Sequence, residues 1–136
     1  MSPPPNEAFR ALFDALRQLR TAWPNRASWS WDGRMKCVAA AFASELAAAA
    51  GQAAAGALPE RWTTATIEKA PEAVQSLADQ YGGIRSNQLL LTRSTPDGLV
   101  AFGLWWPWGD GTTISLRIGI TDESQVPELR ELFATG

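Results

Sequence analysis

Residues 88–120 read QLLLTRSTPDGLVAFGLWWPWGDGTTISLRIGI, and this stretch decides the fold. It contains three runs typical of β-strands, at 88–94, 99–106 and 112–120, separated by glycine-containing turns. The first turn, at 95–98, is Thr-Pro-Asp-Gly, in which proline presets φ and glycine accepts a left-handed conformation. The stretch therefore predicts a three-stranded antiparallel meander with one buried face.

Matching the apolar side chains of neighbouring strands gives an expected register for this meander. Pairing Trp106 with Thr112 places Leu104 opposite Ile114, so that these side chains point into one core and Trp105 points to the other face. The remaining expected pairs are Phe102 with Leu116, Val100 with Ile118, Leu91 with Phe102 and Leu89 with Leu104.

Two helices are predicted before the meander. Asn6 is suited to cap the first helix, whose apolar residues recur at helical spacing up to Trp23, and Pro24 ends it. The second is predicted over 34–55, because alanine has the highest intrinsic helix propensity. Its larger apolar residues form a narrow stripe of Met35, Val38, Phe42 and Leu46.

The rest of the chain adds shorter elements. Threonine-rich residues 61–67 have strand character, and Pro71 suits the first turn of a helix that Gly82 and Gly83 end. A short helix is predicted near 127–133. We therefore expect an α+β fold, with N-terminal helices packed on a three- to four-stranded antiparallel meander sheet and a short C-terminal helix. The expected organisation is a flexible proline-rich arm at 1–5 and a single domain at 6–136.

Composition narrows the class of protein. The chain has 136 residues, a formal net charge of −2 and 46% hydrophobic residues, as ordinary globular domains do. The acidic net charge disfavours a nucleic-acid partner, because binding nucleic acid requires clustered positive charge.

The alanine-rich stretch contains Glu45 and is too weakly apolar for a membrane span. A single cysteine and no signal peptide predict a cytoplasmic protein, and abundant alanine and arginine suggest a bacterial source.

The residues that most enzymes use are scarce. The chain has no histidine, which rules out Ser-His-Asp and Cys-His arrangements and histidine-bound zinc. Cys37 follows a lysine, but a lone cysteine among apolar residues is more often a small core residue than a reactive thiol. Nothing in the sequence brings Asp110 together with Asp97 or Glu45 as a catalytic carboxylate pair. We predict no catalytic residue, metal site or cofactor, and an enzyme is disfavoured.

Tryptophan is the unusual feature, with seven in the chain and three within 105–108. One interpretation is that the indoles of this cluster pack in the core at the end of the sheet. The other is that Trp105, Trp108 and Arg117 form an exposed binding patch around the turn that contains Asp110. A second group, at 29–31, is interpreted as a connector held on the core by two indoles.

The function expected from these observations is a non-enzymatic protein–protein interaction domain, such as an adaptor, chaperone or immunity-type protein. Its partner would be another protein or a second copy of this chain. The alternative is a small-molecule-binding or enzymatic domain with a pocket lined by Trp105, Trp106 and Trp108. A closed pocket with converging polar groups would favour the alternative, and an exposed indole patch would favour the protein partner.

Overall fold

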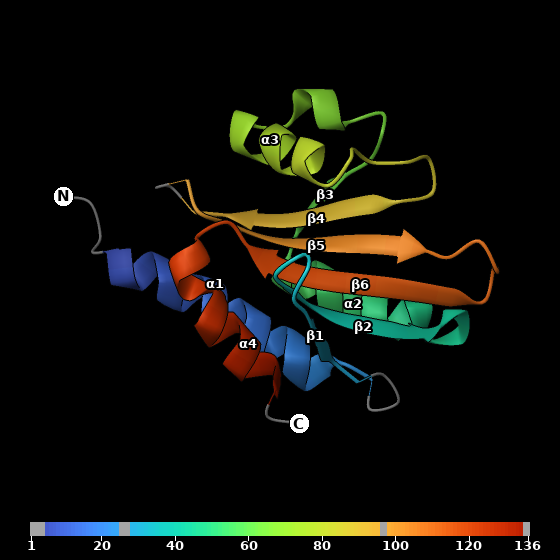
Figure 1. Cartoon of the computed structure of the whole chain (residues 1–136), viewed down its shortest axis with the longest axis horizontal. Coiled ribbons are helices and arrows are strands. Elements are labelled where there is room, and N and C mark those ends of the chain that lie inside the picture. Colours follow the sequence, from blue (N-terminus) through green and yellow to red (C-terminus); the bar gives the residue numbers. More distant parts are fainter. Residues whose placement is uncertain (1–4, 25–27, 96–97, 135–136) are drawn as a thin grey trace.

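The computed structural model describes residues 5–24, 28–95 and 98–134 of the chain. Its strands form one six-stranded antiparallel sheet in the order β1-β2-β6-β5-β4-β3 (Figure 1). The elements, in chain order, are α1 (Pro5–Ala22), β1 (Ser30–Asp32), β2 (Cys37–Ala43), η1 (Ser44–Leu46), α2 (Ala47–Ala57), β3 (Glu60–Trp62), η2 (Ile67–Lys69), α3 (Glu72–Gln80), β4 (Leu89–Ser94), β5 (Val100–Pro107), β6 (Thr113–Ile120), η3 (Glu123–Gln125) and α4 (Val126–Ala134). The α+β class is confirmed, but the expected three or four strands are six.

The predicted meander is confirmed as β4, β5 and β6, which lie side by side in the centre of the sheet. Runs of strand-forming residues separated by two glycine-containing turns explain why the sequence predicts these strands well. Gly98 has a φ of 89°, the left-handed conformation that the predicted turn requires. The Pro96-Asp97 pair of this turn lies outside the described residues.

The helix predicted over 34–55 is wrong in its first half. Residues Cys37–Ala43 form β2, and the helix α2 begins only at Ala47. β2 pairs with the exposed edge of β6, so that Val38, Ala40 and Phe42 lie opposite Ile118, Leu116 and Ile114. The backbone hydrogen bonds between β2 and β6 and the burial of these side chains outweigh alanine's preference for helix, which is worth less than about 1 kcal/mol per residue.

The other predicted elements are confirmed with shifted ends. α1 begins at Pro5, so Asn6 lies inside the helix rather than capping it, and residues 1–4 of the expected arm lie outside the described chain. α3 follows Pro71 as expected, and both Gly82 and Gly83 have a φ of 84°. The strand expected over 61–67 is limited to β3 and followed by η2, and α4 contains the predicted C-terminal helix.

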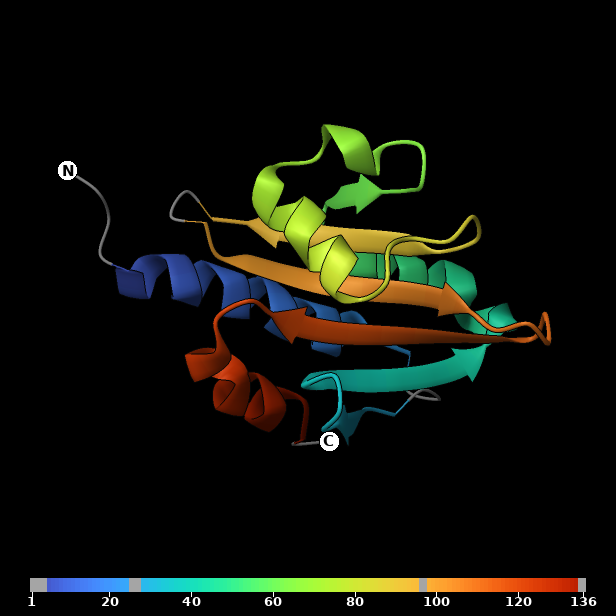
Figure 2. The same ribbon diagram turned by 45° about the horizontal axis from the view of Figure 1, so that its top comes forward.

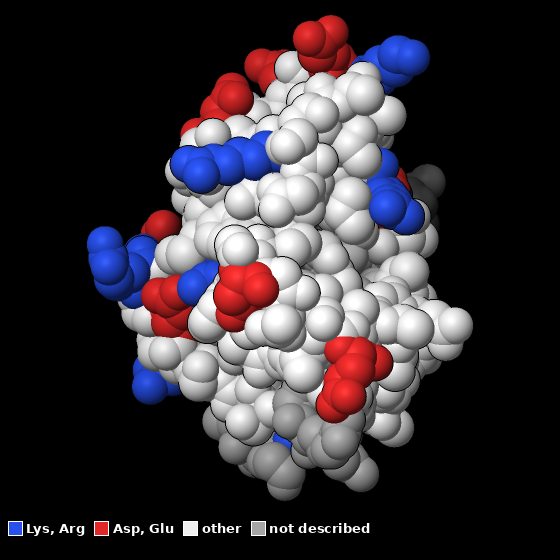
Figure 3. Space-filling view, turned by 90° about the vertical axis from the view of Figure 1, so that its right-hand side faces the viewer, with Lys and Arg blue, Asp and Glu red and all other residues white. Residues whose placement is uncertain are grey.

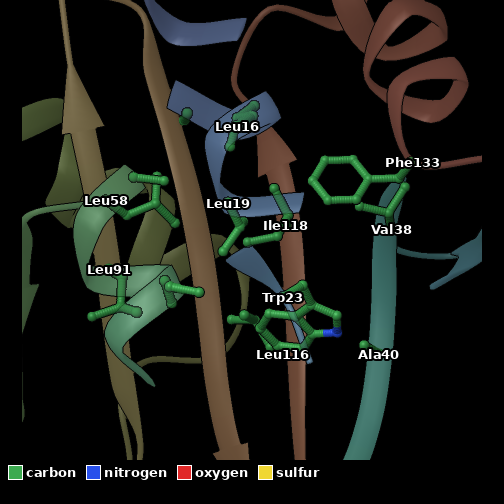
Figure 4. Close-up of a cluster of buried hydrophobic side chains, with 14 of the residues drawn as sticks. Leu16, Leu19, Trp23, Val38, Ala40, Leu58, Leu91, Leu116, Ile118 and Phe133 are labelled. Atoms are coloured by element: carbon green, nitrogen blue, oxygen red, sulfur yellow. The ribbon is translucent and has the colours of Figure 1, made fainter. Parts of the chain in front are cut away.

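The sheet is covered on both faces, but by different amounts of structure. The face we call the three-helix face packs against α1, α2 and α4 (Figures 1 and 4). Figure 4 shows Leu16 and Leu19 of α1 beside Leu116 and Ile118 of β6. The opposite face, called the α3 face, packs against α3 and η2 through Val74, Leu77, Ala78 and Ile67.

The register of β5 and β6 differs from the expected one by three residues. Trp106 pairs with Ser115 and Leu104 with Arg117, where the expected partners were Thr112 and Ile114. A register shift by an odd number of residues places the side chains of one strand on the opposite face relative to those of its partner. The side chains of Phe102, Leu104 and Trp106 therefore lie on the α3 face, away from those of β6 with which they were expected to pack. The first hairpin is shifted by one residue, with Leu89 opposite Trp105 and Leu91 opposite Gly103.

Glycines explain why the observed register is preferred. Gly119 lies opposite Phe102, whose ring fills the space above it, and Gly103 lies opposite Ile118. A large side chain therefore packs over a residue with none, on each face of the sheet. The expected register assumed that only one face of the sheet is buried. Because both faces are buried, matching apolar side chains could not select the observed register.

None of the helices in the described part of the chain combines the length and the apolar character needed to cross a membrane.

Candidate functional site

The turn between β5 and β6 is held by hydrogen bonds from its own residues. The Trp108 N–H donates to the Thr113 carbonyl at 2.8 Å, and Gly111 takes a φ of 74°. The Asp110 carboxylate accepts from the N–H groups of Thr112 at 2.8 Å and Thr113 at 2.9 Å, and from the Thr113 hydroxyl at 2.9 Å. The Thr112 N–H bond and those from Thr113 lower the pKa of Asp110 below its usual range. Asp110 therefore fixes the shape of the turn.

The three tryptophans of this hairpin have three different environments. Trp105 is half-buried on the three-helix face, where its ring centroid lies 5.6 Å from that of Phe42 and its edge lies against Gly51 of α2. Trp106 is half-buried at the edge of the α3-face cluster, so it does face a core, but not the one shared with Ile114 and Leu116 that was expected. Trp108 lies in the turn with 49% of its surface exposed, and it is the one exposed large hydrophobic residue among those described.

Arg117 connects the hairpin to the β1–β2 turn. Its guanidinium carbon lies 5.0 Å from the centroid of the Trp106 ring, a cation–π geometry. Its Nε donates to Asp32 Oδ2 at 3.2 Å, and its Nη1 donates to the Ser115 hydroxyl at 3.1 Å. The Arg117 and Asp32 side chains are 24% and 22% exposed, so the ion pair is partly shielded from water.

Asp32 also shapes the turn that follows β1. Its Oδ1 accepts from the N–H groups of Arg34 at 3.0 Å and Met35 at 3.2 Å. Partial burial alone would raise the pKa of Asp32, but the hydrogen bonds from Met35, Arg117 and Arg34 and the Arg117 charge outweigh it and lower that pKa. The carboxylate is thus ionised and satisfied by its neighbours, which is the mark of a structural role.

Half of the α3 face carries small or polar side chains. α3 lies across β4 and β5, and in Figure 2 β2 and β6 are in view beneath it without a described helix in front. Ala39, Ala41 and Ala43 of β2 lie on this side, opposite Arg117, Ser115 and Thr113 of β6. Ala41 and Ala43 are exposed. We call this surface the open half of the α3 face. It ends at Ala43 and Thr113, beside the β5–β6 turn.

The four residues predicted as one partner-binding patch do not gather in one place. Trp105 and Arg117 lie on opposite faces of the sheet, because Trp105 pairs with Leu116 and Arg117 pairs with Leu104. Trp108 and Asp110 share the turn, where Trp108 is exposed and Asp110 is engaged within the turn. The alternative pocket is also not formed, since Trp105 and Trp106 point to opposite faces.

Cys37 is a buried core residue, as the sequence suggested. It lies in the first position of β2 rather than near a helix start, with no exposed surface, and its thiol contacts the Met35 carbonyl at 3.3 Å. Burial raises the pKa of Cys37 to about 11, although the Tyr81 hydroxyl at 4.0 Å favours the thiolate. The protonated thiol at neutral pH has little nucleophilic character.

The tryptophans around residue 30 have the structural role that was preferred for them. Trp29 packs between Trp23 and Phe133 in tilted and edge-on contacts, with ring centroids 4.6 Å and 4.7 Å away. Trp31 lies in β1, and the Arg130 guanidinium of α4 covers its ring at 5.0 Å. These contacts hold the edge strand β1 against α1 and α4.

Sequence reasoning missed Asp32 and the open half of the α3 face, because residues 37–43 were assigned to a helix. The signal that could have found this strand is the alternation of Val38, Ala40 and Phe42 with single alanines, which fits a period of two as well as a helical stripe.

Within the described ranges, no three acidic or cysteine side chains lie close enough together to hold a metal ion. No protein-family model, curated protein or solved structure matches this chain.

Proposed function

We propose that this chain is a non-enzymatic protein-interaction module that binds a partner protein through the β5–β6 turn, with Trp108 as the anchor. The observation that carries the proposal is the 49% exposure of this indole, whereas the other large hydrophobic side chains of residues 10–24, 28–95 and 98–133 are at least half-buried. Tryptophan is enriched among the residues that dominate binding energy at protein interfaces. The proposed role is that of an adaptor, chaperone or immunity-type protein of the bacterial cytoplasm.

The turn presents the indole in a fixed backbone conformation. Asp110 accepts three hydrogen bonds from Thr112 and Thr113, and the Trp108 N–H is bonded across the turn to Thr113. A loop that is already ordered loses little conformational entropy when it binds. The rigidity of the turn thus increases the affinity that one exposed indole can supply.

The surface around the turn suits a protein partner. Figure 3 views the end of the molecule that carries this turn, and uncharged residues make up most of it, with charged side chains in small separate groups. Interface centres are depleted in charge and enriched in aromatic residues. The open half of the α3 face begins beside the turn, and its alanines allow the partner's backbone to approach closely. The expected partner contributes an apolar pocket for the indole and an uncharged surface over β2.

Replacement of Trp108 by alanine tests the proposal. An exposed residue contributes little to folding, so we expect the free energy of unfolding to change by less than about 0.5 kcal/mol. Affinity for the partner should fall by about 2–4 kcal/mol, roughly 30- to 1,000-fold. The partner is identified by comparing proteins captured from the source cells by wild-type and variant chains, and its affinity is then measured with purified protein. Sedimentation of the chain alone covers the case in which the partner is a second copy.

The matched control is Arg61→Ala, an exposed side chain in the edge strand β3 on the three-helix side of the sheet. It should leave both stability and affinity unchanged. A Trp108→Ala protein that is clearly less stable than wild type but binds the partner equally well would show that the indole is a packing residue, and would refute the proposal.

A further inference from the structure

A second candidate site lies at the other end of the open half of the α3 face. A cleft of about 430 Å³ lies between the C-terminal end of α3, the β1–β2 turn and the segment that joins β6 to α4. Pockets that take small organic ligands have volumes of roughly 300–1,000 Å³. The cleft does not include the β5–β6 turn, so its function is independent of the proposed protein interface.

The floor of the cleft is apolar, whereas its rim carries polar and charged side chains. Leu77 of α3, Phe102 of β5 and Ile120 of β6 line it although each is at most 6% exposed, so they form its floor. Met35 and the ring of Tyr81 complete the wall, and the Tyr81 and Phe102 rings are 5.5 Å apart between centroids. A floor of this kind favours an apolar group that leaves water.

Cationic side chains stand at the mouth of the cleft. Lys36 pairs with Glu123 at 3.2 Å, in an ion pair whose side chains are 59% and 80% exposed. Arg34 also lines the mouth, and in the described part of the chain its guanidinium has no hydrogen-bond or ion-pair partner. Of these three charged side chains, Arg34 is therefore the one without an opposite charge beside it. Its planar guanidinium can donate two parallel hydrogen bonds to a carboxylate.

The backbone of the turn supports a role for these side chains. Lys36 has a φ of 53°, in the left-handed region where glycine or asparagine is favoured, and it is the one non-glycine residue with positive φ in the described ranges. Strain of this kind tends to persist where a side chain is needed. Asp32 holds the turn so that residues 34–36 border the cleft.

We propose that this cleft binds a ligand that joins a compact apolar group to a carboxylate. The apolar group lies against Leu77 and Phe102, and the carboxylate pairs with the Arg34 guanidinium at the mouth. Two sources supply this chemistry, a free aliphatic acid and the apolar C-terminal residue of a peptide.

Titration of the ¹⁵N-labelled chain, followed by amide chemical shifts, tests the proposal. Octanoate is the probe for the free acid, N-acetylleucine is the probe for a peptide C-terminus, and 1-octanol is the uncharged control. We expect octanoate or N-acetylleucine to shift the amides of residues 34–36, 77–81 and 120–121, and the one that binds more tightly identifies the source. The amides of the β5–β6 turn should not move.

The role of the cation is tested by Arg34→Gln, an exposed position whose replacement should not affect folding. This variant should bind the better acid about tenfold more weakly, since a charge-assisted hydrogen bond is lost. The matched control is Arg85→Gln, an exposed arginine that does not line the cleft and should leave the affinity unchanged. The proposal is overturned if neither acid shifts the cleft amides, if 1-octanol binds as tightly as octanoate, or if Arg34→Gln leaves the affinity at the wild-type value.

Discussion

The two faces of the sheet differ in how completely helices cover them. On the three-helix face, α1, α2 and α4 enclose a continuous apolar cluster, in which Leu16, Leu116 and Ile118 have no exposed surface. On the α3 face, one helix and a short 3-10 turn cover β4 and β5, while β2 and β6 keep small or polar side chains. The first face is buried along its whole width, and the second leaves β2 and part of β6 uncovered by any described helix.

The two faces are also stabilised by different kinds of contact, apolar packing on the three-helix face and polar contacts on the open half of the α3 face. The open half of the α3 face is held by Arg117, whose contacts reach Asp32, Ser115 and Trp106. Polar contacts of this kind fix a surface without covering it. The cleft at one end and the indole of Trp108 at the other are both accessible because no described helix crosses this half.

Truncating one buried leucine on each face gives the largest expected effect. Leu116→Ala, at a residue with no exposed surface on the three-helix face, should lower the free energy of unfolding by about 4 kcal/mol. Leu90→Ala, at a residue 1% exposed on the α3 face, should cost about 2–3 kcal/mol, because a single helix above it can settle into the space. Urea unfolding of both variants provides the measurement. A larger loss for the Leu90 variant would contradict the division of stability between the faces.

The glycines under the large side chains give the next largest effect. A Cβ at Gly119 would overlap the Phe102 ring, which is itself packed against Tyr81, so Gly119→Ala should cost about 1–3 kcal/mol. A Cβ at Gly103 would lie 2.9 Å from a terminal methyl group of Leu58, which can rotate away, and Gly103→Ala should cost less than about 1 kcal/mol. Thermal unfolding of the two variants distinguishes these values. If the order were reversed, packing over glycine would not explain the register of β5 and β6.

The parts of the fold that local chemistry determines could be predicted from the sequence. The meander follows from alternating side chains and two turns, and Gly82 and Gly83 end α3 as their conformational freedom suggests. β2 could not be predicted with the same ease, because alanine at every other position satisfies both a helical and a strand period, and its partner β6 is more than 70 residues away. The pairing of β2 with β6 makes this segment a strand rather than a helix.

The candidate site was predictable in composition but not in arrangement. An unusual density of tryptophan in residues 105–108 pointed to this hairpin, and Trp108 is the member that the structure exposes. The division of Trp105 and Arg117 between two faces depends on the register, which an apolar count could not give for a sheet buried on both sides. The role of Asp32 depends on β2, and therefore on the same long-range pairing.

Neutralising Asp32 should give a small effect, and one confined to the α3 face. Asp32→Asn keeps an oxygen that can accept from the N–H groups of Arg34 and Met35 but removes the charge that pairs with Arg117. We expect a loss of about 1 kcal/mol near pH 7, since the pair is partly exposed. The lowered pKa of Asp32 in the folded protein means that its stabilising contribution is present above the pKa of the unfolded chain, about 4, and is lost as the pH falls through the lower folded value.

The difference in stability between wild type and Asp32→Asn should therefore be constant from pH 7 to about pH 5 and shrink below about pH 4. Urea unfolding at a series of pH values measures it, and added salt should reduce it at neutral pH because a partly exposed pair is screened. Since Asp110 is unchanged in both proteins, its own lowered pKa cancels from the comparison. A difference that persists at pH 2 would mean that the substitution acts through shape rather than charge, and that the open half of the α3 face is not held by the Asp32–Arg117 pair.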